Sequence, residues 1–98
     1  MALKKKYLKS KPICKVSFQL TEKELENPQS VELLGSFSDW QPVAMRKVKG
    51  SFTRTVDLKT GAQHQFKYRV NGQNWLNDPA ADAYVANTFS TENSVVSL

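Results

Sequence analysis

Residues 63–78 read QHQFKYRVNGQNWLND, and this stretch decides the fold because it contains a strand, a turn and a second strand. Apolar and polar residues alternate along its first half, a period of two that is typical of a half-buried β-strand. The apolar side comprises Phe66, Tyr68 and Val70, and the polar side comprises Gln65, Lys67 and Arg69. The Asn-Gly pair at 71–72 then favours a hairpin turn. The stretch therefore predicts an antiparallel hairpin with Lys67 on its outer face.

Similar alternation extends outward from this hairpin in both directions. Its clearest instance is residues 14–20, which place on one face the side chains of Cys14, Val16, Phe18 and Leu20. Shorter strand-like runs, separated by turn residues, are VELLGSF (31–37), AMRKV (44–48), FTRTVDL (52–58) and NSVVSL (93–98). Thr21 and Glu24 have the spacing of a capping box, which favours one helical turn before Pro28. About seven short strands without a longer helix predict an all-β antiparallel sandwich, with a five-stranded barrel as the structural alternative.

The length and the N-terminal composition set the domain organisation. A chain of 98 residues has room for one domain, and a hydrophobic content of 40% is sufficient for a packed core. The N-terminal MALKKKYLKSK is rich in lysine, and clear alternation begins after it. We therefore expect a basic, flexible tail over residues 1–11 and a single β-sandwich domain over residues 12–98.

The formal net charge of +5 is concentrated near the N-terminus. Six lysines precede the first acidic residue, Glu22, so the rest of the sequence is nearly neutral. This distribution argues against a nucleic-acid partner, which would favour positive charge spread over the folded domain. No apolar run approaches the ~20 residues that span a bilayer, and we expect a cytoplasmic protein without a membrane partner.

The sequence offers no pattern of catalytic or metal-binding residues. His64 is the one histidine and Cys14 the one cysteine, too few for a metal-ligand cluster. A buried Cys14 and a hydrogen-bonded His64 are the simpler expectations. Asp39 and Asp78 occupy positions where carboxylates commonly bond their own backbone in turns, so they do not indicate a glycosidase pair. The four glycines form no phosphate-binding fingerprint. We expect no enzyme activity, no metal and no cofactor.

Two tryptophans stand apart from the expected core. GSFSDW at 35–40 places Trp40 among loop-forming residues, and within it Phe37 is the better core candidate. Gly35 indicates a bulge or the close approach of another backbone. Trp75 follows the hairpin turn. Tryptophan is usually buried, but phenylalanines at strand positions already supply core aromatics, so we predict that both tryptophans are displayed to solvent.

Flat aromatic rings beside hydrogen-bonding groups suit the surface of a sugar. The axial C–H bonds of a sugar form an apolar patch, and its equatorial hydroxyls form a polar rim. Lys67 can donate to such hydroxyls, and the amides of Asn87 and Asn93 can both donate and accept. These residues predict a carbohydrate-binding surface.

Three motifs, LLGSFSDW, TGAQHQFKYRVNGQNWLNDP and NTFSTENSVV, together resemble the family 48 carbohydrate-binding modules. This family includes the glycogen-binding domain of the AMP-activated protein kinase beta subunit. The motifs are also similar to the N-terminal early-set domains of isoamylases and branching enzymes. The resemblance covers about residues 12–98. It implies an immunoglobulin-like early-set sandwich that binds α-1,4-linked glucans such as glycogen, starch or maltooligosaccharides without catalysis.

The resemblance also implies six carbohydrate-binding residues. Two tryptophans stack on sugar rings, and a lysine bonds sugar hydroxyls. A phenylalanine falls where the kinase-type modules insert a leucine into the curve of the glucan, and a threonine and an asparagine supply polar contacts. In this sequence the six residues are Trp40, Trp75, Lys67, Phe89, Thr91 and Asn93.

The sequence departs from the kinase-type motif at one position before Trp75. That motif runs directly from Gly-Gln to Trp, whereas Asn74 intervenes here. One extra residue moves a side chain to the other face of a strand unless the turn absorbs it. The stretch NDPAADAYVANTF (77–89) is closer to short bacterial early-set proteins. The alternative function is therefore an early-set protein-interaction or regulatory domain with little or no sugar binding, whose partner is a glycogen-metabolising enzyme or another protein.

Overall fold

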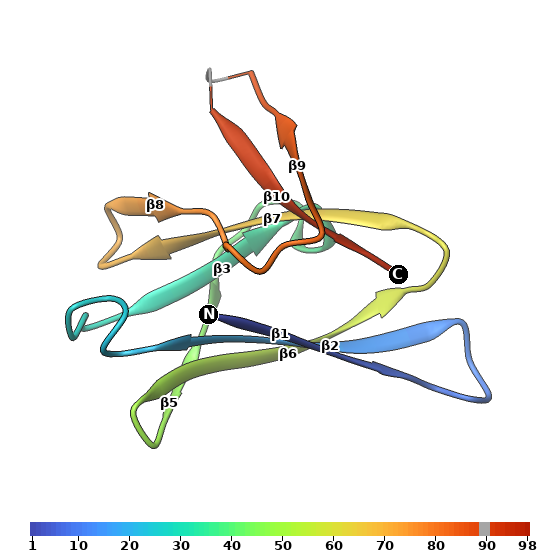
Figure 1. The fold of residues 1–98 in the computed structure, drawn as a ribbon, viewed down its shortest axis with the longest axis horizontal. Helices are drawn as coiled ribbons and strands as arrows, with labels where there is room; N and C mark the ends of the chain where they lie inside the picture. Colours follow the sequence, from blue (N-terminus) through green and yellow to red (C-terminus); the bar gives the residue numbers. More distant parts are fainter. Residues whose placement is uncertain (89–90) are drawn as a thin grey trace.

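Two antiparallel sheets pack face to face in the computed structural model, which describes residues 1–88 and 91–98 (Figure 1). The first sheet has the strand order β1-β2-β6-β5. Its strands are β1 (Ala2–Tyr7), β2 (Ile13–Thr21), β5 (Arg46–Val48) and β6 (Ser51–Lys59).

The second sheet has the order β4-β3-β7-β10-β9, and β8 pairs beside β7. Its strands are β3 (Val31–Gly35), β4 (Val43–Ala44), β7 (Gln63–Val70), β8 (Asn74–Leu76), β9 (Ala83–Ala86) and β10 (Glu92–Ser97). A short 3-10 turn, η1 (Ser36–Ser38), follows β3. The predicted all-β, immunoglobulin-like antiparallel sandwich is confirmed, and the strands form two sheets rather than a closed barrel.

The core lies between the two sheets and uses the alternating positions that the sequence indicates. The apolar side of β2 is fully buried, and the inward residues of β7, Phe66 and Tyr68, face it. The Phe18 ring meets the Phe66 ring edge to face with centroids 4.9 Å apart, and it stacks on Phe37 at 5.9 Å. Phe37 therefore belongs to the core margin, as predicted, and the tryptophans are left out of the core cluster.

The predicted capping-box spacing is realised as a hydrogen-bonded turn rather than a helix. The Thr21 N–H donates to Glu24 Oε2 at 2.8 Å, and the Glu24 N–H donates to Thr21 Oγ1 at 3.2 Å. These reciprocal bonds close the chain as it leaves β2.

The N-terminal residues differ from the expected flexible tail. Residues 2–7 form β1, which pairs along its whole length with β2. Leu3 packs against the core, while Lys4 points to solvent beside it. Lys5 lies on the inner side and reaches Asp82, with 2.7 Å between Nζ and Oδ2. The lysine at this inner position hid the period-two pattern, because alternation is recognised by apolar residues.

Strand β9 is the second difference from the prediction. Residues 78–92 appear in the sequence as a polar, turn-rich connection, yet Ala83–Ala86 form a strand beside β10. In Figure 1, β9 and β10 form a hairpin that projects away from the rest of the second sheet. The pairing of β10 with β7 begins at Ser94, so the first two residues of β10, Glu92 and Asn93, diverge from β7. This divergence creates the setting of the candidate site.

Candidate functional site

Lys67 lies where the edge of β7 passes from one neighbouring strand to another. Phe66, just before it, pairs with Ser94 of β10. Tyr68, just after it, pairs with Leu76 of β8. The sheet therefore forks beside Lys67, with β8 as one arm and the β9–β10 hairpin as the other. Among the predicted residues that the structure describes, Trp75 lies on the β8 arm, Thr91 and Asn93 lie on the hairpin arm, and Trp40 lies on the loop that follows η1.

Trp75 stands on the β8 arm and faces outward. The turn before it has Asn71 and Gly72 at φ values of 54° and 68°, as the predicted Asn-Gly hairpin requires. The Gln73 N–H donates to the carbonyl oxygen of Val70 at 3.1 Å, and Asn74 pairs with Val70. The turn thus absorbs the extra residue. Trp75 pairs with Arg69, shares its outer face and is 48% exposed.

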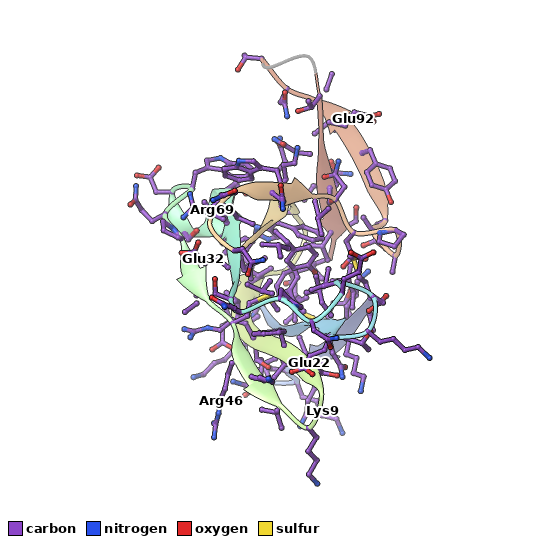
Figure 2. The ribbon with its side chains drawn as sticks, turned by 90° about the vertical axis from the view of Figure 1, so that its left-hand side faces the viewer. Lys9, Glu22, Glu32, Arg46, Arg69 and Glu92 are labelled. Carbon is purple, nitrogen blue, oxygen red and sulfur yellow. The ribbon has the colours of Figure 1, made fainter. Side chains whose placement is uncertain are left out.

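Arg69 connects Trp75 to β3. Its guanidinium carbon lies 5.6 Å from the centroid of the Trp75 ring, within the range of a cation–π contact. Its Nε and Nη2 lie 2.9 and 2.8 Å from Glu32 Oε1. Figure 2 shows Glu32 and Arg69 side by side on the sheet, with Glu92 on the projecting hairpin beyond them. Glu32, Arg69 and Trp75 form one row across three strands.

The hairpin arm carries a chain of hydrogen bonds between polar side chains. Asn87 Nδ2 donates to Thr91 Oγ1 at 2.7 Å and to Asn93 Oδ1 at 2.9 Å. Asn93 Nδ2 in turn donates to Gln65 Oε1 on β7 at 3.0 Å. Lys67 Nζ donates to Thr91 Oγ1 at 3.4 Å, which joins the arm to the fork. Lys67, Thr91 and Asn93 are therefore brought together, and Asn93 is only 8% exposed.

Trp40 approaches from the end of β3, on the loop that follows η1. The backbone N–H of Trp40 donates to the carbonyl oxygen of Gly35 at 2.9 Å, so the loop folds back on the end of the strand. Asp39 and Trp40 both have positive φ, 56° and 59°. Residues with a Cβ adopt this conformation at a cost, and such strain is commonly retained where a side chain is needed for function. Trp40 is 37% exposed, which agrees with the predicted displayed ring.

Gly35 fixes where that loop begins. A Cβ at this position would lie 2.3 Å from the Phe37 ring and 2.7 Å from the carbonyl oxygen of Gln65. The close approach of another backbone that the sequence indicates is therefore present. Because Gly35 pairs with Phe66, the Trp40 loop leaves the sheet one residue away from Lys67 along β7.

An apolar side chain lies under the polar surface of the fork. Leu34 pairs with Lys67, so it shares the outer face of the sheet, yet it is 3% exposed and lies outside the main core cluster. Val95, which pairs with the outward Gln65, is likewise only 1% exposed, so both apolar side chains pack beneath the polar surface.

A buried polar network fixes the segment between the two arms. The Tyr68 hydroxyl donates to Asp78 Oδ2 at 2.7 Å, and the Ala80 N–H donates to Asp78 Oδ1 at 2.8 Å. The Asp78 N–H donates to Ser94 Oγ at 2.9 Å. Burial and the Asp78 carboxylate raise the pKa of Tyr68 well above its ordinary value of 10.0. Asp78 thus bonds its own backbone, as the turn chemistry predicts, and also anchors β7 to β10.

Four of the six predicted site residues have a clear place in the fork, and a fifth borders it. Lys67, Thr91 and Asn93 are linked by hydrogen bonds, and Trp75 shares their outer face. Trp40 borders the fork at the end of β3, without a hydrogen bond from its side chain to the others among the described residues. Phe89 lies outside the residues that the structure describes.

Arg69 and Gln65 were not predicted from the sequence as part of the site, whereas Asn87 was predicted for the sugar-binding surface but is not among the six residues that the resemblance implies. Arg69 and Gln65 were recognisable in part. Arg69 and Gln65 lie two residues on either side of Lys67 in the same alternating strand, so they had to share its face. The contact of Arg69 with Trp75 depends on the strand register, which the sequence does not define.

The one histidine, His64, forms a hydrogen bond with the backbone. His64 Nε2 lies 2.9 Å from the carbonyl oxygen of Lys59, so the imidazole is hydrogen-bonded within its own hairpin. Across residues 1–88 and 91–98, no three or more His, Cys, Asp and Glu side chains gather as metal ligands would. No helix in this described part is long and apolar enough to cross a membrane.

Comparison with known proteins adds relatives of recognised function. The beta-1 subunit of 5'-AMP-activated protein kinase from Rattus norvegicus is 31% identical over 70 residues, which is 71% of this chain and 25% of that protein. The Bos taurus subunit is 33% identical over the same share of both chains. This chain therefore spans about a quarter of the length of these curated relatives.

A solved structure with the same fold is that of the enterobactin esterase FES from Shigella flexneri. It matches with a TM-score of 0.74 and 11% identity over 98% of this chain and 32% of the esterase. At that identity the likeness concerns the fold alone. A family model described as the glycogen recognition site of AMP-activated protein kinase matches residues 23–97, from the turn after β2 to the end of β10. The chain belongs to this family of glycogen recognition domains.

Proposed function

We propose that this chain is a non-catalytic module that binds α-1,4-linked glucan, such as glycogen, on the outer face of its second sheet. The observation that carries the proposal is the fork beside Lys67, where an exposed tryptophan and a hydrogen-bonded set of polar side chains flank the lysine. The family match supports the choice of glycogen over other polymers.

Each part of the fork has a role in this proposal. The rings of Trp40 and Trp75 stack on the apolar faces of glucose units, and Lys67 Nζ donates to their hydroxyls. Thr91 presents a hydroxyl beside Lys67. Asn93 retains one N–H and one lone pair beyond its bonds to Asn87 and Gln65, so it can bond sugar or hold the polar arm in place. Phe89 is proposed from the resemblance as the side chain that enters the curve of the glucan.

The expected affinity is modest. If each tryptophan loses about 100 Å² to the sugar, each contributes roughly 2.5 kcal/mol at ~25 cal/mol/Å². Hydrogen bonds exchanged with water add about 1 kcal/mol each, and the loss of translational freedom offsets several kcal/mol. A dissociation constant between about 1 μM and 1 mM follows. A module of this affinity works through many contacts on a polymer or as part of a larger assembly.

A protein partner forms part of the same proposal. The curated relatives are subunits of a kinase, and this chain covers a quarter of their length. An attached or separate enzyme of glycogen metabolism is the partner that we propose, with the domain bringing that enzyme to the polymer. The chain itself then needs no catalytic residues.

Titration with maltoheptaose, followed by tryptophan fluorescence and calorimetry, tests the glucan proposal. We expect a saturable response below about 1 mM sugar. Cellohexaose, with β-1,4 linkages, is the matched control because its straight chain does not follow the curve of an α-glucan. The absence of a response to maltoheptaose at millimolar concentration, or an equal response to cellohexaose, would refute the proposal.

A further inference from the structure

We propose that Arg69 is a positioning residue, which holds the Trp75 ring so that one face of the indole stays open for a sugar. This inference rests on the proposed glucan binding and deepens it. Arg69 pairs directly with Trp75 on β8 and with Glu32 on β3, so the three side chains lie in a row on the outer face. The guanidinium carbon is 5.6 Å from the ring centroid.

Trp75 needs such support because of its place in the chain. Strand β8 contains three residues, and within the described part of the chain it pairs with β7 on one side only. The residue is 48% exposed, so about half of its surface has no protein contact to hold the ring in place. A mobile ring would have to be ordered when sugar binds, and this loss of rotamer freedom weakens binding. The guanidinium removes part of that cost by fixing the ring before the sugar arrives.

Arg69 is itself fixed from the opposite side. Two of its nitrogens, Nε and Nη2, reach the same oxygen of Glu32 at 2.9 and 2.8 Å. Both side chains are 26% exposed, so the pair is partly shielded from solvent. The planar guanidinium can meet the carboxylate through its N–H edge and the indole through its face at the same time, which a lysine ammonium cannot do. Glu32 therefore orients Arg69, and Arg69 orients Trp75.

The row also determines which indole face accepts the ligand. One face of the Trp75 ring is covered by the guanidinium, and a sugar can stack on the other. Lys67 lies two residues from Arg69 on the same side of β7. A glucan stacked on the open face thus lies on the same side of the sheet as Lys67.

The test uses a protein in which Trp40→Phe leaves Trp75 as the one tryptophan. In this background, Glu32→Gln with Arg69→Met removes both charges while keeping an aliphatic stem, and Arg54→Met, at an exposed position on β6, is the matched control. Acrylamide quenching and fluorescence anisotropy report the freedom of the Trp75 ring without sugar. Maltoheptaose titration of the same substitutions in the otherwise native chain reports binding.

We expect the double variant to increase the acrylamide quenching of Trp75 and to lower the anisotropy of its fluorescence. The dissociation constant for maltoheptaose should be about threefold larger. The Arg69→Lys substitution retains the positive charge, but we expect the anisotropy of Trp75 to stay low. Arg54→Met should leave every measurement unchanged. If the native chain binds sugar and the double variant keeps both the anisotropy and the affinity, the positioning role is wrong while the glucan function stands. If the native chain fails to bind sugar, the function fails and the positioning role fails with it.

Discussion

The hydroxyl of Tyr68 donates a hydrogen bond to the carboxylate of Asp78 at 2.7 Å, and both side chains are completely buried. Tyr68 belongs to β7, which carries Lys67, and Asp78 belongs to the segment that joins the two arms of the fork. The carboxylate also accepts the Ala80 N–H, and the Asp78 carbonyl accepts the Tyr84 hydroxyl at 2.6 Å. This buried pair of side chains therefore fixes the position of the two arms of the proposed site relative to its central strand, β7.

Tyr68→Phe should destabilise the protein by about 1–3 kcal/mol, because it leaves one buried carboxylate oxygen without its donor. Urea unfolding measures this loss. Tyr84→Phe is the control, since that tyrosine is 42% exposed and water can replace its hydroxyl, so the expected loss is below about 1 kcal/mol. Equal losses for the two variants would contradict the role of the buried pair.

Stability should also fall at alkaline pH through Tyr68. Burial and the nearby Asp78 carboxylate raise the pKa of Tyr68 in the folded protein, so the unfolded chain releases this proton at lower pH than the folded chain does. The resulting stabilisation is complete below about pH 10 and declines as the pH rises further. Melting temperatures from pH 8 to 11 should fall more steeply for the native chain than for Tyr68→Phe. Parallel curves would show that Tyr68 does not contribute.

Asp82→Asn should loosen the attachment of β1 to the second sheet. Burial acts to raise the pKa of Asp82, but hydrogen bonds from Lys5 and from the Ser97 N–H, the latter at 2.7 Å, outweigh it and hold the pKa below its ordinary value of 3.8. The stabilisation is present above about pH 4 and disappears as the pH falls through the lowered pKa.

The expected cost of Asp82→Asn at pH 7 is about 0.5–1 kcal/mol, since both partners of the ion pair are partly exposed to solvent. The difference from the native chain should shrink as the pH falls through the lowered pKa, as measured by chemical unfolding at each pH. Lys4→Met, which changes the outward-facing neighbour of Lys5, should have no such pH dependence. A difference that persists unchanged at pH 2 would refute this account.

Trp40→Ala and Trp40→Gly should both weaken glucan binding by more than about tenfold, because each removes a stacking ring. They should differ in stability. Trp40 has a φ of 59°, a conformation that glycine adopts freely and alanine does not. The glycine variant should therefore be about 1 kcal/mol more stable than the alanine variant by urea unfolding. Equal stability of the pair would mean that the loop rearranges once the ring is removed.

Lys67→Met should weaken maltoheptaose binding about tenfold, the loss expected for one hydrogen bond from a charged donor. The methionine retains an aliphatic stem over the outer face, so stability should change by less than about 0.5 kcal/mol. Lys59→Met, on the other sheet, removes an equal charge and should leave the affinity unchanged. Comparable weakening in both variants would indicate a general charge effect instead of a contact.

Much of this arrangement could be predicted from the alternation of residues 63–70. Their period of two separates inward Phe66 and Tyr68 from outward Lys67, and the structure places them so. The turn at Asn71 and Gly72 could also be predicted, because its positive φ values are a local property of those residues. Structural features that depend on residues close together in the sequence could thus be predicted from local chemistry.

The features that were not predicted from the sequence depend on pairing between distant segments of the chain. Strand β1 carries Lys5 where an apolar residue would signal burial, and it is held by β2 and by the Lys5–Asp82 ion pair. The face of Trp75 depended on whether the turn would absorb Asn74, which the register of β7 with β8 decides. Cross-strand contacts such as that of Arg69 with Trp75 follow only after that register is known.

The alternation of β7 also separates two kinds of inherited change. Under the proposed function, substitutions at positions 65, 67 and 69 would alter what the surface binds, whereas those at 66, 68 and 70 would alter whether the sandwich forms. Because the two sets lie on opposite faces, a descendant chain can lose or retune its ligand without repacking its interior. A lineage of such domains can thus keep one architecture while its preferred polymer drifts, one outward side chain at a time.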